Sequence, residues 1–237
     1  MDFGNIIADS FIYPFRNIKS LLLVMVIGVI ACIIGAVPLL TYLLEWINRM
    51  PVSQLDFNGF IELVILLIIV LMMQGYMVDI VKYGVERRSD APGFNFKRQG
   101  LNLIKFTVVN VVYFIIPIIL IWLFSIILGR GFLTLFIDII ILFVFSLGDI
   151  MAICKLAKSD SLREALLIRT AIDDEVSIGL MKIITIISIS VIMTGMALGI
   201  MFFVLNFNNV AGTILLGIFG VYIELFFARA FGLLYSN

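Results

Sequence analysis

Two apolar runs separated by three residues decide the fold of this chain. Between residues 106 and 153 the sequence reads FTVVNVVYFIIPIILIWLFSIIL, then GRG, then FLTLFIDIIILFVFSLGDIMAI. An α-helix needs about 20 mainly apolar residues to cross the hydrocarbon core of a bilayer, and each run is long enough. A connection of three residues forces the second helix to return antiparallel beside the first. The stretch therefore predicts a transmembrane helical hairpin.

The composition of the whole chain agrees with a membrane protein. Of its 237 residues 63% are hydrophobic, and the mean hydropathy is +1.21. That much apolar surface needs lipid as its solvent. The formal net charge is zero, and the charges lie between the apolar runs, which argues against nucleic-acid binding. The chain has no histidine, so catalysis, metal binding and haem binding through histidine are excluded.

Six apolar runs reach or approach the length of a span and group into three hairpins. They are Leu21–Leu44, Phe60–Val78, Phe106–Leu128, Phe132–Ile153, Ile183–Leu205 and Ala211–Phe231. Lys and Arg near span ends stay cytoplasmic, and 14 of the 16 Lys and Arg residues fall on one side of this threading. Only Arg49 and Arg130 fall on the other side. We therefore expect a multi-pass protein of the cell membrane with both termini in the cytoplasm.

A short amphipathic segment precedes each odd-numbered span. The first places Phe3, Ile6, Ile7 and Phe11 on one helical stripe, ahead of a turn at Pro14. The second follows the breaker Pro92-Gly93 and runs from Phe94 to Ile104. The third begins at Ser161 with Glu164 at capping-box spacing, and Asp173-Asp174-Glu175 is expected to begin the helix after it.

These segments predict one all-α domain, residues 1–237, built from three approximate repeats, 1–88, 89–158 and 159–237. Each repeat is an interfacial helix followed by a transmembrane hairpin. The alternative is that the three segments are solvated linkers resting against the membrane.

Several stretches resemble a known but uncharacterised family. They are Asp9-Ser10-Phe11-Ile12-Tyr13-Pro14, Gly75-Tyr76-Met77 leading into Val85-Glu86, Pro92-Gly93-Phe94 to Gly100, Tyr113 with Pro117, and Ala228-Arg229-Ala230-Phe231-Gly232-Leu233-Leu234-Tyr235. Together they resemble an integral-membrane family common in methanogenic archaea. The resemblance implies a cell-membrane protein of about six spans and carries over no functional residue. The basic pair Lys97-Arg98 departs from the more acidic or aromatic character expected there.

Two spans carry polar residues that lipid tolerates poorly, and ionisable residues inside spans are functional candidates by default. Thr134, Asp138, Ser146 and Asp149 recur on one face of the fourth span, with the two aspartates eleven residues apart. In the sixth span Glu224 lies within a seam of small residues, which allows close approach of another helix. We expect these five residues to line a proton or cation route or a polar groove.

The alternative for each of these residues is an interhelical hydrogen bond. Gln74, Asn110, Tyr113 and Ser125 are the partners that the neighbouring spans offer. Asp149 could also lie at the cytoplasmic interface.

Basic residues of the predicted cytoplasmic side form a second set of candidates. Lys97, Arg98, Arg163, Arg169 and Arg229 are expected to contact lipid headgroups or a partner protein, and each contributes about 1 kcal/mol near an anionic surface. Arg229 also suits pairing with a neighbouring helix. The small-residue pair Gly195 and Gly199 suits packing within the chain or formation of a homo-oligomer.

No enzyme signature is present. Ser146-Leu147-Gly148-Asp149 approaches the Gly-x-Gly-Asp motif of intramembrane aspartyl proteases but lacks its first glycine. Cys32 and Cys154 fall in different spans and read as small apolar side chains. The chain is thus expected to be a non-enzyme without metal or cofactor. We predict movement of a small solute, ion or lipid through the bundle; the alternative is a structural or accessory subunit that binds anionic lipid or a membrane partner.

Overall fold

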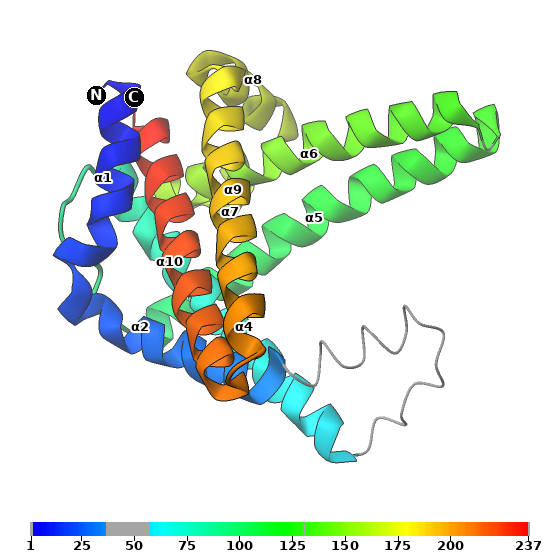
Figure 1. The fold of residues 1–237 in the computed structure, drawn as a ribbon. Helices are drawn as coiled ribbons and strands as arrows, with labels where there is room; N and C mark the ends of the chain where they lie inside the picture. The colour runs from blue at the N-terminus through cyan, green and yellow to red at the C-terminus, as the bar shows by residue number, and fades with distance from the viewer. Residues whose placement is uncertain (1, 37–56, 130, 237) are drawn as a thin grey trace.

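The structure, a computed structural model, describes residues 2–36, 57–129 and 131–236, and all regular structure within them is helical (Figure 1). Its elements are α1 (Phe3–Arg16), α2 (Ile18–Ala31), the π-helical turn η1 (Cys32–Ala36), α4 (Phe57–Val85), α5 (Phe96–Leu128), α6 (Phe132–Ser159), α7 (Leu162–Ala165), α8 (Ile168–Ile178), α9 (Leu180–Leu205) and α10 (Asn209–Tyr235).

Five of the described helices are long and apolar enough to cross a membrane. They are α4, α5, α6, α9 and α10. Each contains one of the five predicted spans that begin at or after Phe60, so those five predictions are confirmed at the level of helix length and composition. The helices extend beyond the predicted spans mainly at their charged ends, as in α6, which reaches Ser159.

The predicted first span, Leu21–Leu44, is seen only in part. The first part of this run lies in α2 and η1. The rest of it, residues 37–44, lies outside the described residues, as do Arg49 and Arg130. The helix over Leu21–Gly35 meets α1 at 86°, so the two together count as a span only if that span is broken. The sixth span and the side on which the termini lie stay predictions.

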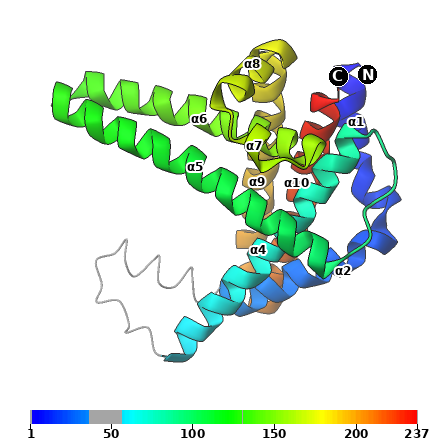
Figure 2. The same cartoon turned by 180° about the vertical axis from the view of Figure 1, so that it is seen from behind.

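Helix α10 lies at the centre of the fold. It contacts α9, α4, α2, α1 and α6, and both termini of the chain lie near its C-terminal end (Figures 1 and 2). Helices α5 and α6 lie side by side as the predicted hairpin. In both views this hairpin projects away from the pair formed by α9 and α10.

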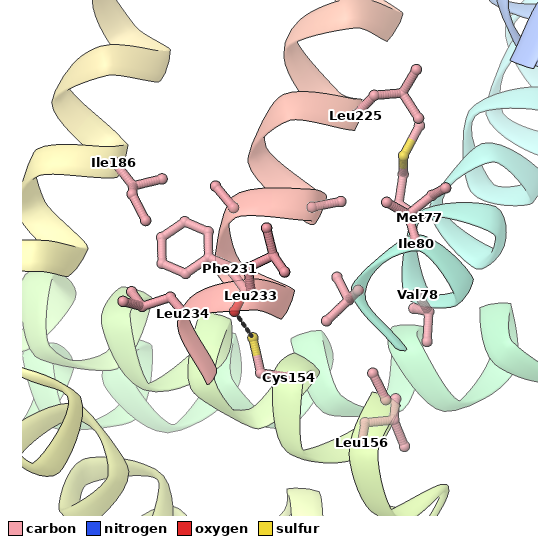
Figure 3. Close-up of a cluster of buried hydrophobic side chains, with 14 of the residues drawn as sticks. Met77, Val78, Ile80, Cys154, Leu156, Ile186, Leu225, Phe231, Leu233 and Leu234 are labelled. Atoms are coloured by element: carbon pink, nitrogen blue, oxygen red, sulfur yellow. Dashed lines mark hydrogen bonds between the residues drawn. The ribbon is translucent and has the colours of Figure 1, made fainter. Parts of the chain in front are cut away.

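The core sits where α4, α6, α9 and the C-terminal half of α10 meet. Figure 3 shows Met77, Cys154, Ile186 and Leu225, one from each of these helices, gathered around α10. The Cys154 thiol donates to the carbonyl of Phe231, with a sulfur to oxygen distance of 3.8 Å. Because lipid is as apolar as these side chains, close fit and dispersion stabilise such a core more than expulsion of water does.

The first amphipathic segment forms a helix, but its surroundings differ from the prediction. α1 continues through Pro14 to Arg16, and the bend comes at Asn17. The helix packs along α10, a contact that its stripe did not predict: the rings of Phe11 and Phe226 are 4.6 Å apart, and the Tyr222 hydroxyl donates to the Phe11 carbonyl at 3.0 Å. Tertiary contacts with α10 therefore hold α1 in place.

The prediction of a separate interfacial helix was wrong at the second position. Asn95 caps α5 by accepting a hydrogen bond from the Arg98 amide at 3.1 Å, and no helix breaker follows before the apolar run. The segment therefore continues the span as one helix from Phe96 to Leu128.

The third segment forms two short helices. Ser161 caps α7 by accepting from the Glu164 amide at 3.4 Å, as its capping-box spacing predicts. The acidic run Asp173-Asp174-Glu175 was expected to begin the next helix. It lies instead inside α8, which begins at Ile168 directly after α7.

Glycines set the closest helix contacts. A Cβ atom built on Gly84 of α4 would lie 2.8 Å from the Cα atom of Gly232 in α10, so these two backbones touch at positions where only glycine fits. The pair Gly195 and Gly199 behaves differently, because a Cβ atom built on either meets nothing within 4 Å. Within the described residues, neither glycine of that pair marks a close approach of another helix.

Candidate binding cavity

A cavity of about 320 Å³ lies between α4, α5, α6 and α10. Each of these helices contributes one polar side chain to its lining: Gln74, Asn110, Asp149 and Glu224, in that order. The remaining wall is apolar and includes Met77, Phe106, Ile150, Cys154 and Phe227. A concave, mainly apolar site with a few converging polar groups is the usual form of a small-molecule site.

The two carboxylates of the cavity are only partly satisfied. The Gln74 side-chain amide donates to Glu224 Oε1 at 3.3 Å, and the Asn110 amide donates to the Phe106 carbonyl at 2.9 Å. Glu224 Oε2 and Asp149 Oδ1 are buried and have no hydrogen-bond partner among the described residues. A buried carboxylate oxygen without a donor is costly. Both oxygens are shielded from the open space of the cavity, so the charge of the two side chains, rather than a bond to these atoms, would act on a bound group.

The polar residues of the cavity lie well inside their helices. Each is ten to fourteen residues from the helix end at which charged connections meet, which at a rise of 1.5 Å per residue is about 15–21 Å. The Arg87 side chain, just after α4, donates to the Ser236 carbonyl beyond α10 at 3.0 Å, and Lys105 of α5 pairs with Asp160 beyond α6 at 2.6 Å. The helices extend beyond the apolar runs, however, and measured from the nearer ends of the predicted spans the four residues lie only four to seven residues inside, about 6–11 Å. The cavity therefore lies within the spans, nearer to their charged ends than to their middle.

A larger groove of about 520 Å³ carries no comparable chemistry. It runs between the α1–α2 bend, α9 and α10, and its lining is almost wholly apolar, as with Phe15, Met193 and Phe219. The Tyr222 hydroxyl is the polar side-chain group at its edge, and it already donates to the carbonyl of Phe11. The groove suits contact with lipid, so the smaller cavity is the candidate site.

The structure divides the predicted polar stripe of α6. Asp149 lines the cavity with Glu224, whereas Asp138 does not. The two aspartates share a face, but eleven residues of helix separate them by about 16 Å. Thr134 donates to the Gly129 carbonyl at 2.7 Å, and the exposed Ser146 donates to Leu142 within its own helix. Of the five predicted residues, the structure thus brings Asp149 and Glu224 together at the cavity and places Thr134, Asp138 and Ser146 outside its lining.

Two residues of the cavity were predicted only as partners of the carboxylates. The bond from Gln74 to Glu224 realises one of the interhelical contacts that the sequence offered as an alternative. Asn110 lines the cavity and bonds its own helix instead. In the sequence each is a neutral amide inside an apolar run. A neutral amide indicates a functional site less strongly than an ionisable residue does.

Arg229 was expected to reach lipid headgroups or a partner protein, or to pair with a neighbouring helix, and the structure favours the last of these. Its side chain is 3% exposed. Its guanidinium donates to Asp9 Oδ2 from Nε at 3.0 Å and from Nη2 at 2.9 Å, and to the Arg88 carbonyl from Nη1 at 2.6 Å. It also lies over the Tyr13 ring, 4.6 Å from the centroid. Arg229 therefore joins α10, α1 and the connection after α4.

The other basic candidates lie at the surface. Arg98 pairs with the buried Asp79 of α4 at 3.0 Å, and its side chain is 44% exposed. Lys97, Arg163 and Arg169 are exposed. No group of three or more Cys, Asp or Glu side chains in the described part of the chain is placed to hold a metal ion.

Glu175 was not among the predicted site residues, yet it is a buried carboxylate of α8, outside the spans. A Cβ atom built on Gly148 of α6 would lie 3.6 Å from Glu175 Oε1 and 3.1 Å from the Tyr113 ring of α5. Oε1 has no hydrogen-bond partner among the described residues. Burial raises the pKa of Glu175 to about 7, because the charged form is poorly solvated there.

We predict that Glu175 makes the protein less stable as pH rises. The unfolded carboxyl ionises near pH 4.5, whereas the folded one holds its proton until about pH 7. The folded state therefore binds more protons between these values, and the free energy of unfolding falls across that window and stays low above it. Melting temperatures in detergent, measured from pH 4 to pH 8, should fall more steeply for the natural chain than for Glu175→Gln. Equal slopes would contradict the prediction, and Glu164→Gln, on the exposed face of α7, should keep the natural slope.

Comparison with known proteins places the chain in a family. No curated protein and no solved structure matches it. A family profile described as "Protein of unknown function (DUF4013)" matches residues 59–206, more than half of the chain. The match includes Gln74, Asn110 and Asp149 but ends before Glu224. The expectation of an uncharacterised family is thus confirmed, and the chain belongs to the family of proteins of unknown function DUF4013.

Proposed function

We propose that this protein is a non-enzymatic transporter of the cell membrane, which moves a small solute through the cavity between α4, α5, α6 and α10. The observation that carries the proposal is the pair of acidic side chains, Asp149 and Glu224, that line this cavity, each with a buried oxygen that has no hydrogen-bond partner among the described residues.

The position of the carboxylates supports transport over a purely structural role. A charge at bilayer depth is costly and is retained mainly where it acts on an ion or substrate pathway. Solute sites of transporters lie between helices inside the membrane, and all four polar residues of the cavity lie within predicted spans. Its volume of about 320 Å³ is at the lower end of the usual range for small-molecule sites, which favours a small solute.

The test is solute flux in proteoliposomes. Labelled cationic, neutral and anionic solutes should be compared, and one class should enter faster than into empty liposomes. The double variant Asp149→Asn with Glu224→Gln should lower that flux to the level of empty liposomes, because the amides keep the shape and remove both charges. Asp138→Asn, on the same helix but outside the cavity, should keep the natural rate. Transport is excluded if no class moves faster than into empty liposomes.

A second candidate function is that of a non-transporting accessory subunit that holds anionic lipid or a membrane partner. It is supported by Lys97, Arg163 and Arg169, which are exposed and have no ion pair within the described residues, and which would each contribute about 1 kcal/mol at an anionic surface. The open pair Gly195 and Gly199 on α9 would suit a neighbouring helix, including that of a second copy. Absence of flux in the experiment above would favour this role.

A further inference from the structure

We infer that the solute of this cavity is a small organic cation, an alkylammonium compound. The inference rests on the proposed function for the place of the site, and it adds the chemical class of the ligand. Three properties of the cavity carry it: the sign of its charge, the chemistry of its wall and its size.

The charge of the lining has one sign. Asp149 and Glu224 are its ionisable carboxylates, and no Lys or Arg among the described residues lines the cavity. Glu224 Oε1 accepts from the neutral amide of Gln74. Glu224 Oε2 and Asp149 Oδ1 have no hydrogen-bond donor among the described residues. Because an unpaired charge in a low-dielectric site is strongly unfavourable, a cation bound in the cavity would offset the negative charge of both side chains.

The wall around the carboxylates suits a cation with an apolar surface. Phe106 of α5 and Phe227 of α10 line the cavity together with aliphatic residues and Met77. An aromatic face attracts a cation within about 6 Å of its centre, and it also accepts methyl and methylene groups. A bare metal ion would gain little from such a wall, since hard cations prefer several oxygen ligands.

The size of the cavity excludes the simplest alternative. A volume of about 320 Å³ is far more than one dehydrated ion needs, and within the described residues no three acidic or thiol side chains gather to hold a metal. An alkylammonium compound of a few carbons fills such a space and carries a charge opposite in sign to that of the lining.

The test compares charged and neutral ligands of the same shape on the purified full-length protein. Binding of choline, tetramethylammonium and butylammonium should be measured by calorimetry in detergent, with dimethylbutanol as the neutral isostere of choline. At least one cation should bind saturably, and choline should bind at least about tenfold more tightly than dimethylbutanol if it is that cation. The inference is overturned if the isostere binds as tightly as choline, or if none of the three cations binds.

Variants locate the binding. Glu224→Gln should weaken the affinity for the cation at least tenfold, because it removes one partner of a buried charge pair, and Asp149→Asn should do the same. Phe227→Leu keeps the bulk and loses the ring, so it should weaken binding about three- to tenfold. Asp138→Asn should bind like the natural chain. Unchanged affinity in folded Glu224→Gln and Asp149→Asn would overturn the assignment. If the variants do not fold, the comparison of choline with dimethylbutanol still tests the inference, because it uses the natural chain.

The flux experiment separates this inference from the proposed function. Flux of a neutral or anionic solute that depends on Asp149 and Glu224 would support the proposed transport function and contradict the inference that the ligand is a cation. Binding of a cation without flux would support the inferred class of ligand and contradict the proposed transport function.

Discussion

Replacing Arg229 with Gln should lower the free energy of unfolding by about 3 kcal/mol or more, the usual effect of breaking a buried ion pair by removing one partner. The guanidinium is 3% exposed and joins Asp9, the Arg88 carbonyl and the Tyr13 ring. Glutamine cannot reach all three groups with its shorter, neutral side chain. At about 2–4 °C per kcal/mol for a chain of this size, the melting temperature in detergent should fall by at least about 6 °C.

The matched control is the other arginine on the same carboxylate. Arg16 pairs with Asp9 Oδ1 at 2.9 Å, but its side chain is 55% exposed. An exposed pair contributes only about 0–1 kcal/mol, so Arg16→Gln should cost far less than Arg229→Gln. Adding Asp9→Asn completes a double-mutant cycle, in which Asp9 and Arg229 should show strong coupling. Equal losses for the two arginines would show that burial of Arg229 contributes nothing.

The sequence was sufficient for the spans because their signal is local. Helices α5 and α6 are visible as two apolar runs around Gly129-Arg130-Gly131, and lipid requires each run to satisfy its own backbone hydrogen bonds as a helix. The packing of α1 against α10 could not be predicted from local sequence in this way. Its stripe of Phe3, Ile6, Ile7 and Phe11 fits a membrane surface and a neighbouring helix equally well, and only the three-dimensional arrangement brings Phe226 against it.

The site could be predicted by residue type but not by arrangement. Glu224 and Asp149 were visible because a carboxylate inside an apolar run is unusual. Which carboxylates face each other depends on where α6 crosses α10, and no periodicity within one helix gives that crossing point. Periodicity therefore joined Asp138 to Asp149 on one face, whereas the cavity joins Asp149 to Glu224. The neutral amides Gln74 and Asn110 complete the cavity, and neutral amides are common enough in spans to give little warning.

The second large effect is expected where α4 and α10 touch. A Cβ atom built on Gly232 would collide with the carbonyl oxygen of Val81 and lie 2.9 Å from the Cα atom of Gly84. Both obstacles belong to the backbone, so no side chain can rotate away. Gly232→Leu should therefore force the two helices apart and cost about 3 kcal/mol, at the upper end of overpacking effects, with a matching fall in melting temperature.

Gly220 supplies the control on the same helix, because a Cβ atom built there meets nothing within 4 Å and the residue is exposed. Leucine is a better helix former than glycine by about 0.8 kcal/mol, so Gly220→Leu should leave the melting temperature unchanged or raise it. If Gly232→Leu were tolerated as well as Gly220→Leu, α4 and α10 could not be in backbone contact. The cavity, whose walls include both helices, would then have a different shape, and Gln74 of α4 would no longer be held beside Glu224 of α10.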